Sequence, residues 1–360
     1  MHFNALRSTF RQLLDTRISI ELKSAPGRGK STFIEETVEL ESRRDGEEWG
    51  VSTLFLATQT PPDLIGYLFK GEREYDGQTI AISDPTAPTW MFTREGKPLS
   101  HYKRGILFLD EYGQGEADVK RASAELFLNR RLGPWSLPEG WSVVAASNRE
   151  KDRSGVTKAF DFVINRRLEI NITDDLKSWE DWAFRAGVDP TFIAFANSNP
   201  QIVFADGVPE KQGPWCTPRS LVMAAKLLNN LREDDGKLPA GPIAVELTSG
   251  LIGEAAAAQL FATIRLGHEM PALDEIMKNP GKVKVPTKPD AQMLVTYNLA
   301  ARVDASNATP VIEYMMRMPK EFGVTFAKVA CQRMPALVYE PAFEKWAEEN
   351  ATLMTAVVRV

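Results

Sequence analysis

The segment at residues 24–32, SAPGRGKST, constrains this chain more than any other part of its sequence. It matches the pattern GxxxxGK[ST] except at the first position, where Ser24 replaces glycine. In such loops the glycines let backbone N–H groups face phosphate oxygens, the lysine reaches the outer phosphates, and the next hydroxyl binds Mg²⁺. An alternating stretch at 17–22 predicts a strand before the loop, and 31–41 predicts a helix after it. The residues expected to bind the nucleotide are Pro26, Gly27, Arg28, Gly29, Lys30, Ser31 and Thr32.

Residues 105–111, GILFLDE, carry an apolar run into two carboxylates. This pattern is typical of a buried parallel strand with acidic side chains at its carboxyl end. With a phosphate-binding loop upstream, Asp110 is expected to hold Mg²⁺ together with Ser31, and Glu111 to polarise the attacking water. A core strand that ends in a solvated acidic turn is the weaker alternative. The two motifs together predict an ATPase that uses ATP and Mg²⁺.

Composition and charge indicate where such a chain works. The net charge is −5, so no overall basic field attracts nucleic acid or an anionic membrane. Cys216 and Cys331 are the only cysteines, which fits a reducing compartment without disulfides. Residues 1–17 predict an amphipathic helix that lacks the apolar core of a signal peptide, and the apolar run at 255–264 is too short to span a bilayer. We expect a cytoplasmic protein with no membrane segment.

The order of the expected elements predicts the fold class. Five short apolar runs separated by helical or loop stretches predict an α/β fold with a five-stranded parallel sheet and flanking helices. After about residue 174 the strand signal fades, and helical patterns continue to the end of the sequence. A stretch rich in Pro and Lys at 278–292 reads as a connector. The expected strands are 17–23, 52–58, 105–110, 142–147 and 168–172, and the expected domains are 1–174, 175–280 and 281–360.

Later motifs resemble those of the MoxR-like AAA+ ATPases. In AASNRE (145–150), Asn148 stands where this family has its sensor 1 residue, which helps to orient the attacking water. The segment DFVINRRLEI at 161–170 resembles the family's arginine-finger segment. The match falls on Arg166, with Arg167 as the open alternative.

A further match lies in the helical part. WCTPRSL (215–221) resembles the sensor 2 stretch of the family's lid, with Arg219 as an arginine that acts in its own subunit or in a neighbour's. The resemblance covers about residues 15–230. It implies a P-loop AAA+ nucleotide-binding core at 1–174 and a helical lid at 175–280. The helical patterns beyond the connector predict a C-terminal helical extension at 281–360, which carries no motif of the family. The catalytic residues that the resemblance implies are Glu111, Asn148, Arg166 and Arg219.

The resemblance also implies an assembly and a kind of substrate. In AAA+ proteins the arginine finger comes from the adjacent protomer, so the chain is expected to form a closed ring, with six as the family's usual number. MoxR-like proteins typically work with a partner that carries a von Willebrand A domain. The leading expectation is an ATPase that remodels or matures a protein partner or complex. The alternatives are a nucleic-acid motor or loader and a nucleotide-switched scaffold; the acidic charge disfavours the former, and the intact Glu111 disfavours the latter.

Two stretches resemble hairpins that face the pore in related hexamers, at 58–69 and 129–141. Their aromatic residues are either handles for a substrate or ordinary packing; these residues are Tyr67, Phe69, Trp135 and Trp141. Arg130 and Arg131 are rivals of Arg166 for a contact with the neighbouring subunit, although surface salt bridges are their commoner use. Ser24, which shapes the turn without touching phosphate, should change nucleotide affinity only modestly.

Overall fold

The computed structural model describes residues 1–152, 164–232 and 236–350. The chain folds into two compact units. The first contains Met1–Asp175 and Asp206–Val208, and the second contains Leu176–Ala205 and Pro209–Val360. The two units are described separately below. The domain boundaries expected at 174 and 280 remain predictions.

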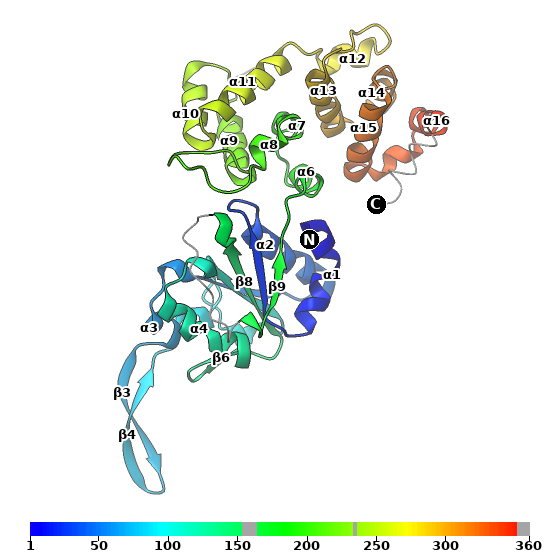
Figure 1. Ribbon diagram of the computed structural model, residues 1–360. Coiled ribbons are helices and arrows are strands. Elements are labelled where there is room, and N and C mark those ends of the chain that lie inside the picture. Colours follow the sequence, from blue (N-terminus) through cyan, green and yellow to red (C-terminus); the bar gives the residue numbers. More distant parts are fainter. Residues whose placement is uncertain (153–163, 233–235, 351–360) are drawn as a thin grey trace. The chain divides into compact units, whose positions relative to one another are not determined.

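The first unit is built on a five-stranded sheet of order β2-β5-β8-β1-β9 (Figure 1). Each neighbouring pair in this sheet is parallel, as the alternation of strands and helices predicts. The order places β1 beside β8, and β8 beside β5, so the carboxyl ends of these three strands share one edge. The strands are β1 (Ile20–Ser24), β2 (Gly50–Phe55), β5 (Gly105–Asp110), β8 (Trp141–Asn148) and β9 (Leu168–Asn171).

Helices cover both faces of this sheet, which explains why β5 is apolar on both faces up to Asp110 at its carboxyl end. On one face, Ile106 and Phe108 of β5 pack in a cluster with α1 (Phe3–Asp15) and α2 (Lys30–Asp45). On the other face, Leu107 and Leu109 pack in a cluster with α3 (Pro61–Ile65) and α4 (Ala117–Asn129). Successive residues of β5 thus enter two different cores. The predicted α/β fold class is confirmed.

Two antiparallel hairpins accompany the sheet. The longer one, β3 (Leu68–Tyr75) and β4 (Gln78–Pro85), extends away from the rest of its unit (Figure 1). Its turn is Asp76-Gly77, and both residues have positive φ, as tight two-residue hairpin turns require. The shorter hairpin consists of β6 (Arg131–Leu132) and β7 (Trp135–Ser136). The shorter hairpin lies within the stretch 129–141, whereas the longer one begins only at the end of the stretch 58–69 and continues to Pro85.

Among the described residues of the second unit, helices are the regular secondary structure, and no strand is present. Its helices are α6 (Leu176–Arg185), α7 (Pro190–Ser198), α8 (Pro200–Val203), α9 (Pro218–Asn230), α10 (Pro242–Ile252), α11 (Glu254–His268), α12 (Leu273–Lys278), α13 (Pro289–Arg302), α14 (Ala308–Met315), α15 (Lys320–Arg333) and α16 (Pro341–Glu349). None of the helices described in either unit is long and apolar enough to cross a membrane.

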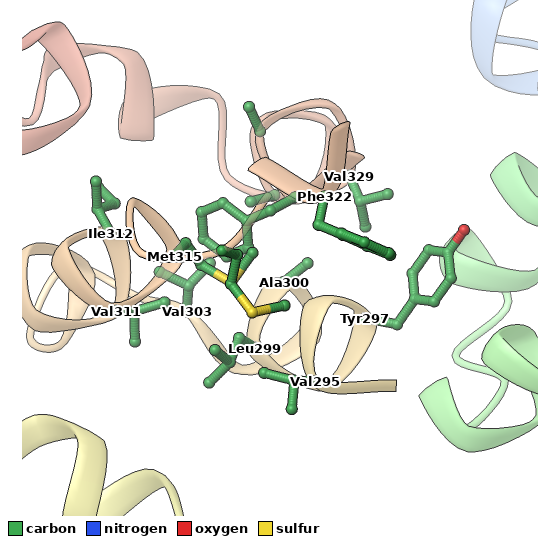
Figure 2. Packing of buried hydrophobic residues seen from close by; sticks show 14 of the residues in the cluster. Val295, Tyr297, Leu299, Ala300, Val303, Val311, Ile312, Met315, Phe322 and Val329 are labelled. Atoms are coloured by element: carbon green, nitrogen blue, oxygen red, sulfur yellow. The ribbon is translucent and has the colours of Figure 1, made fainter. Parts of the chain in front are cut away.

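Helix α7 lies between two hydrophobic clusters of this unit. Phe192 and Phe195 pack with residues of α9, α10 and α11. Ile193 and Ala194, on the adjoining face of the same helix, pack with residues of α12 to α16. Figure 2 shows part of this second cluster, with side chains from α13, α14 and α15 in contact. Because α7 contributes to both clusters, the helices before and after residue 280 share a packed core.

Candidate active site

The predicted phosphate-binding loop occupies residues 25–29, between the end of β1 and the start of α2. Gly27 has φ +71° and Gly29 has φ +88°, a left-handed conformation that side chains other than glycine rarely adopt. No atom lies within 4 Å of the position of a Cβ on Gly29, so the backbone conformation, and not a lack of space, requires glycine there. Gly29 is also the N-cap of α2. The N–H groups of the first turn of α2 therefore point into the loop, which is the geometry of an anion site.

Lys30 connects the loop to the neighbouring strand. Its Nζ donates hydrogen bonds to Oδ1 of Asn148 at 3.0 Å and to Oγ of Ser24 at 3.1 Å. Ser24 and Asn148 are partners in the parallel ladder between β1 and β8, which explains why both reach the same ammonium group. The structure thus brings Lys30 and Asn148 together. It also gives Ser24 a polar contact that the sequence pattern did not suggest.

Ser31 and Asp110 meet on the other side of the loop. Ser31 Oγ donates to Asp110 Oδ2 at 2.8 Å, and the backbone N–H of Glu111 donates to Asp110 Oδ1 at 2.9 Å. Among the described residues, no three His, Cys, Asp or Glu side chains cluster as a protein-only metal site. Mg²⁺ needs no such cluster, because it is commonly held by one or two protein oxygens together with phosphates and water. The hydroxyl and carboxylate pair therefore fits Mg²⁺ that arrives with a nucleotide.

Glu111 has a strained backbone. Its φ is +52°, in the left-handed region, where a non-glycine residue costs on the order of 1–3 kcal/mol. The residue directly follows β5 and precedes a short 3₁₀ helix, Tyr112–Gln114. Strain of this kind is frequent at functional sites, where the surrounding structure maintains it. Here it turns the chain at the edge of the sheet where the phosphate-binding loop also lies.

The two arginines of the predicted finger segment differ sharply in their surroundings. Arg166 is exposed. The side chain of Arg167 is only 1% exposed, and its Nη2 lies 2.6 Å from Oε2 of Glu21. Arg167 is therefore occupied inside its own subunit. Of the two candidates, Arg166 alone has a side chain that a second copy could reach.

The other predicted arginines occupy separate places. Arg130 donates to the backbone carbonyl oxygen of Pro138 at 3.1 Å, and Arg131 pairs with Glu125 at 2.8 Å, so both are engaged around the short hairpin. Arg219 is exposed on α9 in the second unit, and its role stays a prediction.

In the loop itself, the guanidinium of Arg28 is buried against Asp174, with Nε 2.9 Å from Oδ1. Burial raises the pKa of the Asp174 carboxyl, and the nearby Arg28 charge opposes that shift.

The four aromatic residues proposed as handles fall into two groups. Trp141 is fully buried, and its Nε1 donates to the carbonyl oxygen of Leu99 at 3.1 Å. Trp135 is half-buried and donates to the carbonyl oxygen of Ile65 at 2.8 Å. Of the two interpretations, ordinary packing holds for Trp141, because it is a core residue of β8. Tyr67 and Phe69 remain, with exposures of 57% and 62%.

The comparison with known proteins gives distant likenesses. No family model and no curated protein matches the chain. Among solved structures, NtrX from Brucella abortus is 15% identical with a TM-score of 0.40, over 91% of this chain and 67% of that one. NtrX in complex with ATP matches with a TM-score of 0.38, also at 15% identity. A mutant of RuvB from Thermotoga maritima is 12% identical with a TM-score of 0.38, over 87% of each chain. Because these sequence identities and TM-scores are low, the function of the chain is argued below from its own residues.

Proposed function

We propose that this chain is an ATP-hydrolysing AAA+ ATPase of the MoxR-like type, which works as a ring and remodels or matures a protein partner or complex. One observation carries the proposal. At one edge of the sheet, Lys30 contacts Asn148 and Ser31 contacts Asp110. The side chains come from the first two residues of α2, directly after the loop, and from the ends of β8 and β5. A cation, an amide, a hydroxyl and a carboxylate are therefore gathered where a loop with glycines at positive φ can bind phosphate.

Each group has a distinct task in phosphoryl transfer. Bound ATP with Mg²⁺ would supply the phosphoryl group that is transferred to water. Lys30 offsets charge on the phosphates, while Ser31 and Asp110 hold the metal. Glu111 polarises the attacking water, and Asn148 orients it. Since little covalent chemistry is left to the protein, these residues act by positioning and by electrostatic stabilisation.

The exposed Arg166 completes the site from a neighbouring copy. Within the described parts of the chain, no acidic side chain is found in an ion pair with Arg166, whereas Arg167 is paired. An arginine supplied in trans stabilises the charge of the transition state and accelerates hydrolysis by several orders of magnitude. Contacts that run head to tail and close produce a ring. We adopt a hexamer, the usual number of the resembled family, as the working assembly.

The long hairpin favours a protein over a nucleic acid as the substrate. Its exposed apolar side chains include Leu68 at 66%, Phe69 at 62% and Tyr75 at 74%. Over residues 67–86 the charged side chains are mostly acidic, with Lys70 and Arg73 against Glu72, Glu74, Asp76 and Asp84. Nucleic-acid binding depends on clustered basic residues. We therefore assign the hairpin to contact with a polypeptide, such as a partner with a von Willebrand A domain of the kind that the resembled family uses.

Two substitutions test the chemistry. Lys30→Ala should abolish ATP binding, because Lys30 contacts the phosphates already in the ground state. Glu111→Gln should bind ATP with unchanged affinity and hydrolyse it at least about a hundredfold more slowly, because Glu111 acts mainly in the transition state. Titration calorimetry and phosphate release measure the two effects. The matched control is Glu116→Gln, an exposed glutamate before α4, which should keep both properties. Wild-type turnover in Glu111→Gln would contradict the assignment.

A further inference from the structure

A buried ion pair lies behind the candidate active site. Glu21 of β1 and Arg167, the residue before β9, have side chains 2% and 1% exposed. Their charged groups are 2.6 Å apart. Ile20 and Leu22 face the cluster of α1 and α2, so the alternation along β1 puts Glu21 on the opposite face of the sheet, where α4 packs.

Other groups fix the pair in place. The Arg167 guanidinium lies over the rings of Tyr112 and Phe127, at 5.2 and 5.7 Å from their centroids. Such contacts orient a planar cation and add to its stabilisation. On the other side, Glu21 Oε1 accepts a hydrogen bond of 2.5 Å from Ser147 Oγ. Glu21, Arg167, Tyr112, Phe127 and Ser147 are called the Glu21 cluster below.

Three members of the Glu21 cluster are sequence neighbours of the proposed catalytic residues. Tyr112 follows Glu111, Ser147 precedes Asn148, and Arg167 follows Arg166. Adjacent residues share a peptide plane, so a side chain held at one position restrains the backbone of the next. The Glu21 cluster thus lies beside the chain segments that carry Glu111, Asn148 and Arg166, and Arg167 is the member that is joined directly to Arg166.

Stability alone is a weak reason for such a pair. Removing two charges from water is costly, and apolar replacements of similar volume are often as stable as a buried ion pair. A charged pair does, however, fix one geometry, because its energy depends on distance and on the planar shape of the guanidinium. The ion pair therefore fixes the position of Arg167, and with it the backbone of Arg166, to which Arg167 is joined directly.

We propose that Glu21 and Arg167 are positioning residues, which hold Arg166 in the place where it reaches the nucleotide of a neighbouring subunit. The inference rests on the proposed function of Arg166. When the pair is disturbed, Arg166 is no longer held in place. A displacement of about 1 Å in a group of this kind lowers turnover by about 100-fold. ATP affinity should not change, since neither Glu21 nor Arg167 belongs to the phosphate-binding loop.

The test compares five variants with the wild type. Arg167→Lys keeps a cation beside Glu21 but loses the planar group that stacks on Tyr112 and Phe127. The double variant Glu21→Gln/Arg167→Met removes both charges of the pair, so neither partner is left without the other, and retains an acceptor for Ser147. Arg166→Ala and Arg166→Ala/Arg167→Lys complete a double-mutant cycle. The matched control is Arg11→Lys, at an arginine that pairs with Glu41 at 2.7 Å and Asp45 at 2.6 Å between α1 and α2.

We expect Arg167→Lys and the charge-free double variant to lose about 10- to 100-fold in kcat, with the Kd for ATP within about twofold of wild type. Arg11→Lys should keep wild-type kcat. On the Arg166→Ala background, Arg167→Lys should cause no further loss, because a positioning residue has nothing left to position. If Arg167 had only a structural role, its substitution would lower kcat by the same factor with or without Arg166, and the two losses would multiply.

Two results would overturn the inference: wild-type kcat in Arg167→Lys, or a loss that multiplies with that of Arg166→Ala. Wild-type turnover in Arg166→Ala itself would show that the finger assignment of the proposed function is at fault, and the positioning role would be lost with it.

Discussion

At the scale of single residues, Ser24 shows how the site departs from the common loop pattern. Its hydroxyl accepts a hydrogen bond of 3.1 Å from Lys30 and donates one of 2.9 Å to the carbonyl oxygen of Ala25. A glycine at this position offers neither contact. Ser24 therefore holds the lysine side chain near the end of β1.

This contact leads to a prediction for Ser24→Gly. Lys30 must leave the hydroxyl, or share it, to reach a phosphate, and a hydrogen bond to a charged group contributes about 1.5–3 kcal/mol before compensation. We expect Ser24→Gly to tighten ATP binding by about two- to tenfold, with hydrolysis retained. Titration calorimetry with ATP and Mg²⁺ measures the change. A tenfold weaker affinity would mean that Ser24 supports the bound state and not the free one.

Single residues also mark the limit of reasoning from sequence. The loop and the acidic strand could be predicted because each is a contiguous pattern with one chemical purpose. The choice between Arg166 and Arg167 could not, because it depends on Glu21, which lies far away in the chain. Trp141 poses the same problem: its burial follows from sheet packing, and nothing in the neighbouring residues separates it from an exposed tryptophan.

At the scale of elements, the presence of a strand was easier to predict from the sequence than the residues at which it begins and ends. The predicted strand at 105–110 coincides with β5, since both flanks carry clear signals. The predicted strand at 17–23 begins three residues before β1, which starts at Ile20. The prediction extends too far because Ile18 continues the alternating pattern of apolar residues. Apolar periodicity reports burial, and the hydrogen bonds that define a strand depend on its neighbours in the sheet.

The long hairpin gives an element-scale prediction. No residue of β3 or β4 is buried and most are exposed, so the hairpin contributes little to the core of its unit. Replacing residues 68–85 with a short Gly-Ser linker should leave the Tm within about 2 °C and keep basal ATP hydrolysis within about twofold. Calorimetry and phosphate release check both values. The control replaces β6–β7, whose Trp135 packs against the core, and should lower the Tm clearly. A large loss of basal ATPase on removal of β3–β4 would place the hairpin in the site itself.

At the scale of the whole molecule, the account depends on a site that two copies share. Lys30, Ser31, Asp110, Glu111 and Asn148 belong to one copy, and Arg166 is proposed to act on the next. The sequence predicts this division only through a resemblance, because no pattern within one chain specifies which groups cross an interface. The buried Arg167 and the exposed Arg166 are the structural features that support it.

Mixing two inactive variants tests the shared site most directly. Arg166→Ala keeps Glu111, and Glu111→Gln keeps Arg166, so a mixed ring contains some interfaces with both groups intact. In a randomly mixed ring these make up about a quarter of the interfaces at equal amounts, and fewer at other ratios. We therefore predict that ATP hydrolysis rises from near zero to a maximum at equal mixing and falls again. Lys30→Ala mixed with Glu111→Gln is the control; both residues serve the same copy's site, so no recovery should occur. A flat, inactive response at every ratio of Arg166→Ala to Glu111→Gln, with subunit exchange demonstrated, would contradict the account.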